Sequence, residues 1–266
     1  MKNIENIKAR QKTKLLEKFK NSKIFINETQ KELYCNKVAE ALAYVECVIP
    51  EKYTKYTVLD FDGKSNQERD LITTDIALNA KDLICKYCWG TNWKQVVQKY
   101  PSPKEQRQFF RSHSIMNKRL EEGNNVVIFG QSETPIGRTT ISAIIMKEAI
   151  KLRMYPINIG QTYEWIDYPS LKDELKRDGE IAGDCRTCDW LVVDDIVKSN
   201  YSLKQRTYIT ELIDPFFMYR LKNKLPTILV FKFDIRNKSI SLEESMGIGI
   251  SNIINDNRTL KIPLNE

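Results

Sequence analysis

Residues 130–140 have the composition of a loop that binds phosphate groups. The short apolar run Val126, Val127, Ile128 and Phe129 precedes this stretch, and apolar residues recur at helical spacing after it. A strand, a glycine-containing turn and a helix in this order place free backbone N–H groups and the positive end of the helix dipole against an anion. The chemistry predicted here is the binding of nucleotide phosphates.

The loop is a degenerate form of the common pattern G-x-x-x-x-G-K-[ST], the Walker A motif. Gly137 and Thr139 match the pattern, but Arg138 stands in the lysine position, and two extra residues separate Gly130 from Gly137. Arginine keeps the positive charge but is bulkier and planar. We expect Gly130, Gly137, Arg138, Thr139 and Thr140 to bind ATP. The alternative interpretation is an ordinary turn between a strand and a helix.

A pair of carboxylates follows a second apolar run. Residues 190–193 predict a buried strand, and Asp194 and Asp195 come directly after it. A strand buried on both faces delivers such side chains to the edge of the sheet where ligands bind. We expect Asp194 to hold Mg²⁺ and Asp195 to orient the attacking water. The acidic pair strengthens the interpretation of the loop as a nucleotide site.

Two cysteine pairs have the spacing by which zinc sites present thiolates. They are Cys85 with Cys88, and Cys185 with Cys188, and together they could form one structural Zn²⁺ site. The alternative is that all four are buried, reduced thiols. The single histidine, His113, argues against Ser-His and Cys-His catalysis.

Positive charge and aromatic residues suggest contacts with nucleic acid or a partner protein. The formal net charge is +7, and residues 1–23 hold eight Lys or Arg but only Glu5 and Glu17. Such an arm suits a polyanion or an acidic partner, although a solvated helix face explains it equally well. Trp89, Trp93 and Tyr100 could stack on single-stranded bases, or they could form a small aromatic core.

The remaining pattern predicts elements that would position these residues in an α/β fold. Helices are expected at 4–20, 29–47, 75–88, 104–121, 162–178 and 203–222, and strands at 125–129, 157–159, 190–193 and 227–231. Strands that alternate with helices predict a parallel sheet with helices on both faces. No signal peptide and no membrane-spanning run is evident, so we expect a cytoplasmic protein with no membrane association.

From about residue 49 onward the chain resembles the DnaC-type helicase loaders and the related IstB-like transposition ATPases of the AAA+ superfamily. The resemblance lies in the order of four segments: 49–61 as the entry segment, 129–140 as the phosphate loop, 190–196 as the acidic strand, and 226–235 as the sensor strand. It implies an AAA+ domain at 49–266 with a helical insertion at about 75–121. Residues 1–48 would form a small, basic, helical partner-binding region.

Four positions depart from what the resemblance implies for hydrolysis. Arg138 replaces the loop lysine, Asp195 replaces a catalytic glutamate, Lys232 takes the place of the sensor asparagine, and Asn252 takes that of the arginine finger. A missing arginine finger alone costs about 10³ to 10⁵ in rate. We therefore expect hydrolysis to be weak or absent unless Arg258 or a partner subunit supplies the charge.

The resemblance implies a DNA replication accessory protein. It would bind ATP with Mg²⁺, hold a replicative helicase through its N-terminal region and help to load it on single-stranded DNA, with homo-oligomerisation as a further expectation. Two alternatives stay open: an adaptor that keeps the AAA+ fold without using nucleotide, and a helper ATPase in transposition.

Overall fold

A five-stranded parallel sheet forms the centre of the computed structural model, which describes residues 3–20, 22, 24–25, 27–59, 74–130, 137–154, 160–197, 209–236 and 241–264. The strand order is β2-β3-β4-β1-β5, and every neighbouring pair is parallel. The strands are β1 (Val126–Phe129), β2 (Tyr163–Asp167), β3 (Trp190–Ile196), β4 (Thr227–Phe231) and β5 (Leu260–Pro263). The predicted α/β class with a parallel sheet is confirmed.

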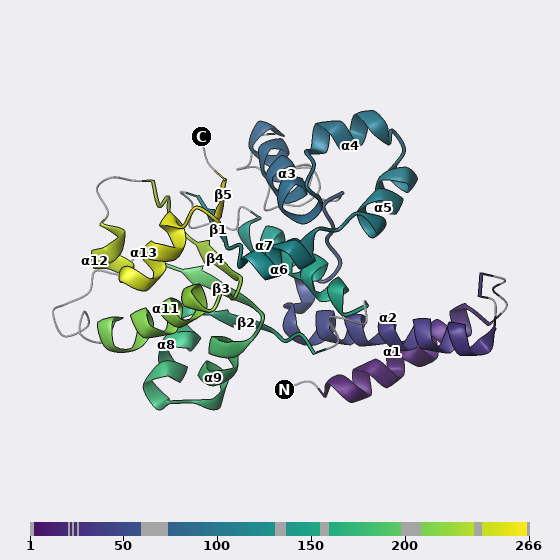
Figure 1. The fold of residues 1–266 in the computed structure, drawn as a ribbon, viewed down its shortest axis with the longest axis horizontal. Helices are drawn as coiled ribbons and strands as arrows, with labels where there is room; N and C mark the ends of the chain where they lie inside the picture. The colour runs from purple at the N-terminus through teal and green to yellow at the C-terminus, as the bar shows by residue number, and fades with distance from the viewer. Residues whose placement is uncertain are drawn as a thin grey trace.

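Helices cover both faces of this sheet (Figure 1). Alternate residues of β3 show the separation, because Trp190 and Val192 pack into one apolar cluster and Leu191 and Val193 into the other. The longer helices are α1 (Ile4–Lys18), α2 (Glu28–Val48), α3 (Thr74–Trp89), α5 (Pro103–Ser112), α7 (Arg138–Ile150) and α8 (Tyr168–Arg177). The shorter helices are η1 (Glu51–Tyr53), α4 (Trp93–Lys99), α6 (Met116–Glu122), η2 (Lys151–Met154), α9 (Glu180–Thr187), η4 (Ile209–Ile213), α11 (Asp214–Lys222), α12 (Leu242–Met246) and α13 (Ile248–Asn255).

The helices α1 and α2 form a hairpin that extends from the body of the molecule (Figure 1). Three basic residues of α1 pair with glutamates of α2: Lys8 with Glu40, Arg10 with Glu46, and Lys12 with Glu32. The basic arm predicted from the sequence is therefore partly neutralised within the protein. Arg153 of η2 also pairs with Glu40, at 2.5 Å, and its guanidinium lies 4.0 Å from the Tyr44 ring centre, so the hairpin is fixed to the body.

The predicted aromatic cluster lies in the helical group α3–α6. Trp89 is buried, its ring centre lies 4.4 Å from that of Phe110, and Trp93 stacks on the same Phe110 ring. Tyr100 stacks on Phe109, which also stacks on His113. These aromatic rings pack against one another, which favours the interpretation as a small aromatic core over that as a surface for stacking bases.

Several element predictions were wrong in their details. Residues 162–178 are not one helix, since β2 occupies the first part and α8 begins only at Tyr168. Residues 104–121 form two helices, α5 and α6, and α4 lies in a segment for which no helix was predicted. The predicted strand at 157–159 lies outside the described residues, as does the 203–208 part of the predicted 203–222 helix. Among the described residues, no helix has both the length and the apolar character needed to cross a bilayer.

One fully buried arginine joins the second apolar cluster to the starts of two strands. Arg220 of α11 is 0% exposed. Its guanidinium donates to the carbonyls of Cys185 and Cys188 at the end of α9, to the carbonyl of Pro226 and to the Thr227 hydroxyl, at 2.8 to 2.9 Å. A cation at the carboxyl end of a helix is favourable because it opposes the negative end of the dipole.

We predict that Arg220→Met lowers the free energy of unfolding by about 3 kcal/mol or more, because each buried carbonyl left without a donor costs about 1–3 kcal/mol. Urea denaturation followed by circular dichroism measures the change. Arg177→Met, which removes an exposed arginine at the end of α8, is the control and should cost less than about 1 kcal/mol. Equal losses in the two variants would contradict the role assigned to Arg220.

Candidate nucleotide site

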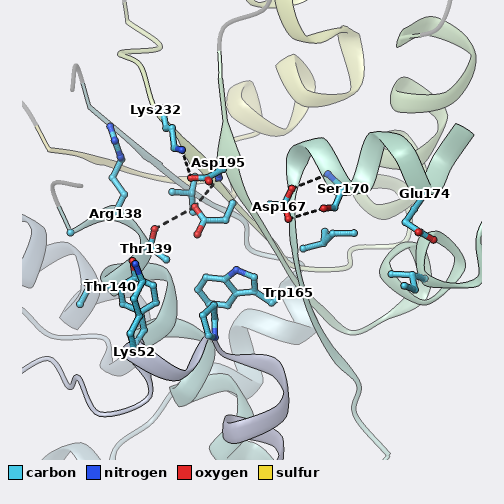
Figure 2. Close-up of a pocket in the computed structure, with 17 residues that line it drawn as sticks. Lys52, Arg138, Thr139, Thr140, Trp165, Asp167, Ser170, Glu174, Asp195 and Lys232 are labelled. Carbon is cyan, nitrogen blue, oxygen red and sulfur yellow. Dashed lines mark hydrogen bonds and ion pairs between the residues drawn. The ribbon is translucent and has the colours of Figure 1, made fainter. Parts of the chain in front are cut away.

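A cavity of about 740 Å³ opens at the carboxyl end of the sheet, beside the first turn of α7 (Figure 2). This edge is where ligands bind in parallel α/β sheets. The lining residues come from η1, α7, α8, α9 and strands β2, β3 and β4, and are Pro50, Lys52, Tyr53, Gly137, Arg138, Thr139, Thr140, Trp165, Ile166, Asp167, Ser170, Glu174, Ile181, Asp194, Asp195, Val230 and Lys232. All the residues predicted to bind nucleotide, except Gly130, line this one cavity.

The backbone N–H groups in the first turn of α7 have no acceptor within the helix, and residues 137–140 line the cavity. Gly137 precedes the helix with φ of 85°, a left-handed conformation that favours glycine, and no side chain of the described residues caps the helix there. The first intrahelical bond is donated by Ile141 to the Gly137 carbonyl. The amides before Ile141 and the positive end of the dipole are therefore placed to receive an anion.

Thr139 and Asp194 meet across the cavity, although 55 positions separate them in the sequence. The Thr139 hydroxyl donates to Asp194 Oδ1 at 3.5 Å. Asp194 is 7% exposed, and this burial raises the pKa of its carboxyl, while the hydrogen bond from the Asp195 amide opposes the rise. A hydroxyl and a carboxylate beside an anion-binding helix end are oxygen ligands of the kind that suits Mg²⁺ with a phosphate. The residues present fit Mg²⁺ and a nucleotide.

Asp195 occupies an irregular point of β3. Its φ is 59°, and the pairing of β3 with β4 shifts register between Val193 and Ile196. In a regular strand neighbouring side chains point to opposite faces, but a bulge changes this alternation, and Asp194 and Asp195 both line the cavity. The Asp195 carboxylate pairs with Lys232 of the β4 end, at 2.8 Å (Figure 2). Asp195 and Lys232, both at positions that the resemblance assigns to hydrolysis, thus neutralise each other.

Arg138 lines the cavity, but its guanidinium is bonded to the backbone at the start of the loop. It is 4% exposed, and its Nη1 donates to the carbonyl of Gly130 at 2.8 Å. In Figure 2 its guanidinium points away from Thr139 and Thr140. Gly130 and Arg138 flank residues 131–136, which lie outside the described residues, so this bond joins the two ends of the loop.

The sequence did not reveal two other walls of the cavity as parts of the site. Pro50, Lys52 and Tyr53 were known only as part of an entry segment, and Lys147 of α7 holds that segment by donating to the carbonyls of Thr54 and Tyr56. On the other side Trp165 and Asp167 belong to β2. The alternation from Tyr163 to Asp167 was the signal for this strand, and it was missed because the segment was interpreted as a helix.

The residues considered for the arginine-finger role lie elsewhere. Asn252 is on α13, and its side-chain amide contacts the sulfur of Met218. Arg258 pairs with Asp256 at 2.6 Å and donates to the carbonyl of Glu122. Neither residue lines the cavity.

The predicted four-cysteine zinc site is not formed. Cys85 and Cys88 pack into the apolar cluster on one face of the sheet, and Cys185 and Cys188 pack into the cluster on the other face. The sheet therefore separates the two pairs, and the described residues contain no group of three or more His, Cys, Asp or Glu that could hold a metal ion. All four cysteines are buried and free, as the alternative interpretation held.

Comparisons with known proteins found similar folds but no match by sequence. No protein-family profile and no curated protein matches the chain. Similar solved structures include a putative primosome component from Streptococcus pyogenes serotype M3, with 16% identity and a TM-score of 0.44 over 81% of this chain and 89% of that one. A DnaI structure has 16% identity and a TM-score of 0.44, covering 82% and 94% of the two chains. The DnaC helicase loader has 19% identity and a TM-score of 0.42, covering 65% and 97%.

We predict that the native protein contains no stoichiometric zinc. We also predict that the buried thiols of Cys85, Cys88, Cys185 and Cys188 react slowly with thiol reagents. Burial raises the pKa of the Cys85 thiol to about 12 and that of Cys188 to about 11, so the reactive thiolate is scarce at neutral pH. Metal analysis and titration with a chromogenic disulfide reagent, with and without urea, measure both properties. One zinc per chain that is released when these thiols are modified would contradict this arrangement.

Proposed function

We propose that the protein binds a nucleoside triphosphate with Mg²⁺ in the cavity at the carboxyl end of the sheet. The observation that carries the proposal is the meeting of Thr139, at the amino end of α7, with Asp194, at the end of β3. Mg²⁺ supplies the charge that neutralises phosphate oxygens during binding and transfer. The chain contributes the amides of α7 for the phosphates, and the Thr139 hydroxyl and Asp194 carboxylate for the cation.

We further propose that hydrolysis is slow. Asp195 is one bond shorter than glutamate and is paired with Lys232, so its carboxylate is not free to orient water. A misplacement of about 1 Å costs on the order of 100-fold in rate. Arg258 is engaged by Asp256, so in this proposal a partner subunit supplies any arginine finger.

The biological role that we propose is that of a DNA replication accessory protein related to helicase loaders. The order of motifs along the sequence supports this role, and the α1–α2 hairpin offers a surface for a replicative helicase. Among the described residues, four of the ten exposed large apolar side chains belong to the hairpin: Ile24, Leu33, Tyr34 and Leu42. Exposed apolar residues that gather on one projection are typical of protein-binding surfaces. In this proposal the hairpin holds the helicase, and the body contacts single-stranded DNA.

A nucleotide-independent adaptor is the second candidate. Two contacts favour it, because the bond from Arg138 to Gly130 and the Lys232–Asp195 pair both occupy groups that an ATPase would use. Titration with a fluorescent ATP analogue and Mg²⁺ separates the candidates, since an adaptor of this kind shows no saturable binding at millimolar concentrations.

For the nucleotide site we predict that Thr139→Ala weakens Mg²⁺-dependent ATP binding by about 10- to 100-fold, because a contact to a charged group contributes about 1.5–3 kcal/mol. Thr139→Ser, which restores the hydroxyl, is the matched control and should bind nearly as the native chain does. Fluorescence anisotropy at fixed Mg²⁺ measures the affinities. If all three proteins bind ATP equally, the assignment of Thr139 is wrong.

For the hairpin we predict that Leu33→Glu abolishes co-purification with the cognate hexameric helicase, because the substitution places a charge in an apolar contact. Ile248→Glu is the control: its side chain is 53% exposed, Leu33 is 55% exposed, and Ile248 lies on α13, away from the hairpin. Size-exclusion chromatography of the mixed proteins gives the result. Equal binding by both variants, or no binding by the native chain, would contradict the proposed interface.

A further inference from the structure

The helical group α3–α6 has a strong excess of positive charge. Residues 86–120 contain eight Lys or Arg and a single acidic residue, Glu105, so this segment has a formal charge of +7, equal to that of the whole chain. In the basic arm at residues 1–23, by contrast, Lys8, Arg10 and Lys12 pair with glutamates of α2. Much of the unbalanced charge of the protein therefore lies on this helical group.

Three of these cations form one row on α5. Lys104, Arg107 and Arg111 are spaced by three and four residues, so they lie on one face of the helix, and all three are exposed. The row spans ~10 Å, at about 1.5 Å per residue. The ion pairs that the structure describes in this group belong to Lys118 and Arg119, and none involves the row. The row therefore presents its charge to solvent.

The aromatic core of the group holds α5 in this orientation. Trp89 Nε1 donates to the carbonyl of Phe110 at 3.0 Å, and the side-chain amide of Gln106 donates to the carbonyl of Tyr100 at 2.9 Å. Gln106 and Phe110 are the buried residues of α5. In Figure 1, α4 and α5 form the outer end of the group, away from the sheet. The cations of α5 are thus fixed on a rigid support at the periphery of the molecule.

The single acidic residue of the segment is engaged at the start of α5. Glu105 accepts hydrogen bonds from the amide and the hydroxyl of Ser102, at 3.1 and 2.7 Å, and these bonds lower the pKa of its carboxyl. Together the two residues form the capping box of the helix. On α4, Lys94 and Lys99 add two further exposed cations. The outer end of the group is therefore a positively charged surface.

Such a surface suits the phosphate backbone of duplex DNA. Duplex DNA carries one negative charge per ~1.7 Å of its axis, which is a higher density than that of a single strand. Proteins that hold single strands also stack the bases on aromatic rings. Here Trp93 packs on Phe110, and Tyr100 packs on Phe109. Contacts to phosphate carry no sequence information, so we expect no preference for a base sequence.

We propose that the row formed by Lys104, Arg107 and Arg111 binds the phosphate backbone of duplex DNA without sequence preference. The row is separate from the cavity, because no residue of α3–α6 lines the cavity. It is also separate from the α1–α2 hairpin. Binding therefore requires neither nucleotide nor a helicase, and it adds a contact with paired DNA to the contact with single-stranded DNA proposed above.

Fluorescence anisotropy with a labelled duplex of about 20 base pairs, without nucleotide and at about 50 to 200 mM salt, tests this inference. The double variant Arg107→Gln and Arg111→Gln should bind about tenfold or more weakly at the lowest salt. Its slope of log affinity against log salt concentration should be smaller by about two, because each phosphate contact contributes about 0.9. Arg107→Lys with Arg111→Lys keeps both charges and should retain most of the affinity.

The matched control is the double variant Lys14→Gln and Lys18→Gln. It removes the same charge from two exposed residues of α1, which are also four positions apart on one helix face. We expect its duplex affinity to change less than about twofold. Thermal unfolding of each variant without DNA establishes that the folds are intact.

The other outcomes would overturn the inference. Absence of duplex binding by the native chain at about 50 mM salt contradicts it. Equal losses in the α5 and α1 variants also contradict it, because the effect would then come from net charge alone. Unchanged duplex affinity in the α5 variant would indicate an acidic protein as the partner of this surface, and a loss confined to single strands would overturn the assignment to duplex DNA. Failure to bind ATP or a helicase bears only on the proposed function.

Discussion

The parallel direction of β1, β3 and β4 is the constraint on which the rest of the site depends. Three segments far apart in the sequence end at one edge of the sheet, and each contributes a different group there: the turn before α7, the acidic pair and Lys232. Both faces of the sheet are covered, so these strands consist almost entirely of buried apolar residues. At the carboxyl edge of the sheet, polar residues begin where β3 and β4 leave the core, and Asp194, Asp195 and Lys232 line the cavity there.

The sequence predicted the parts of the fold in which local and global requirements agree. The apolar runs at 126–129 and 227–231 are short, buried and bounded by turn residues, and these features favour a strand over a helix. The same is true of Asp194, because a carboxylate that follows such a run must lie at the edge of the sheet. The meeting of Thr139 and Asp194 followed from these two placements.

Other features depended on contacts between distant residues, which the sequence does not display. Cys85 and Cys185 have the same spacing to their neighbours as zinc ligands have, but the sheet lies between them, and only the position of α3 and α9 on opposite faces reveals this. The position of the Arg138 side chain could not be predicted from the sequence either. Its guanidinium bonds to the Gly130 carbonyl, whereas its place in the motif predicted a contact with phosphate. Trp165 was missed since a strand of five residues resembles a helix segment when its polar and apolar residues are mixed.

The two ends of α7 have different neighbours, and this has a mechanical consequence. Its first turn lies at the cavity, while its last turn continues into η2, where Arg153 pairs with Glu40 at the root of the hairpin. The helix is 13 residues long, which corresponds to ~20 Å. A hydrogen-bonded α-helix is stiff along its axis, so α7 is a rigid connection between the cavity and η2. The cavity and the base of the projecting hairpin are therefore joined by one continuous helical segment.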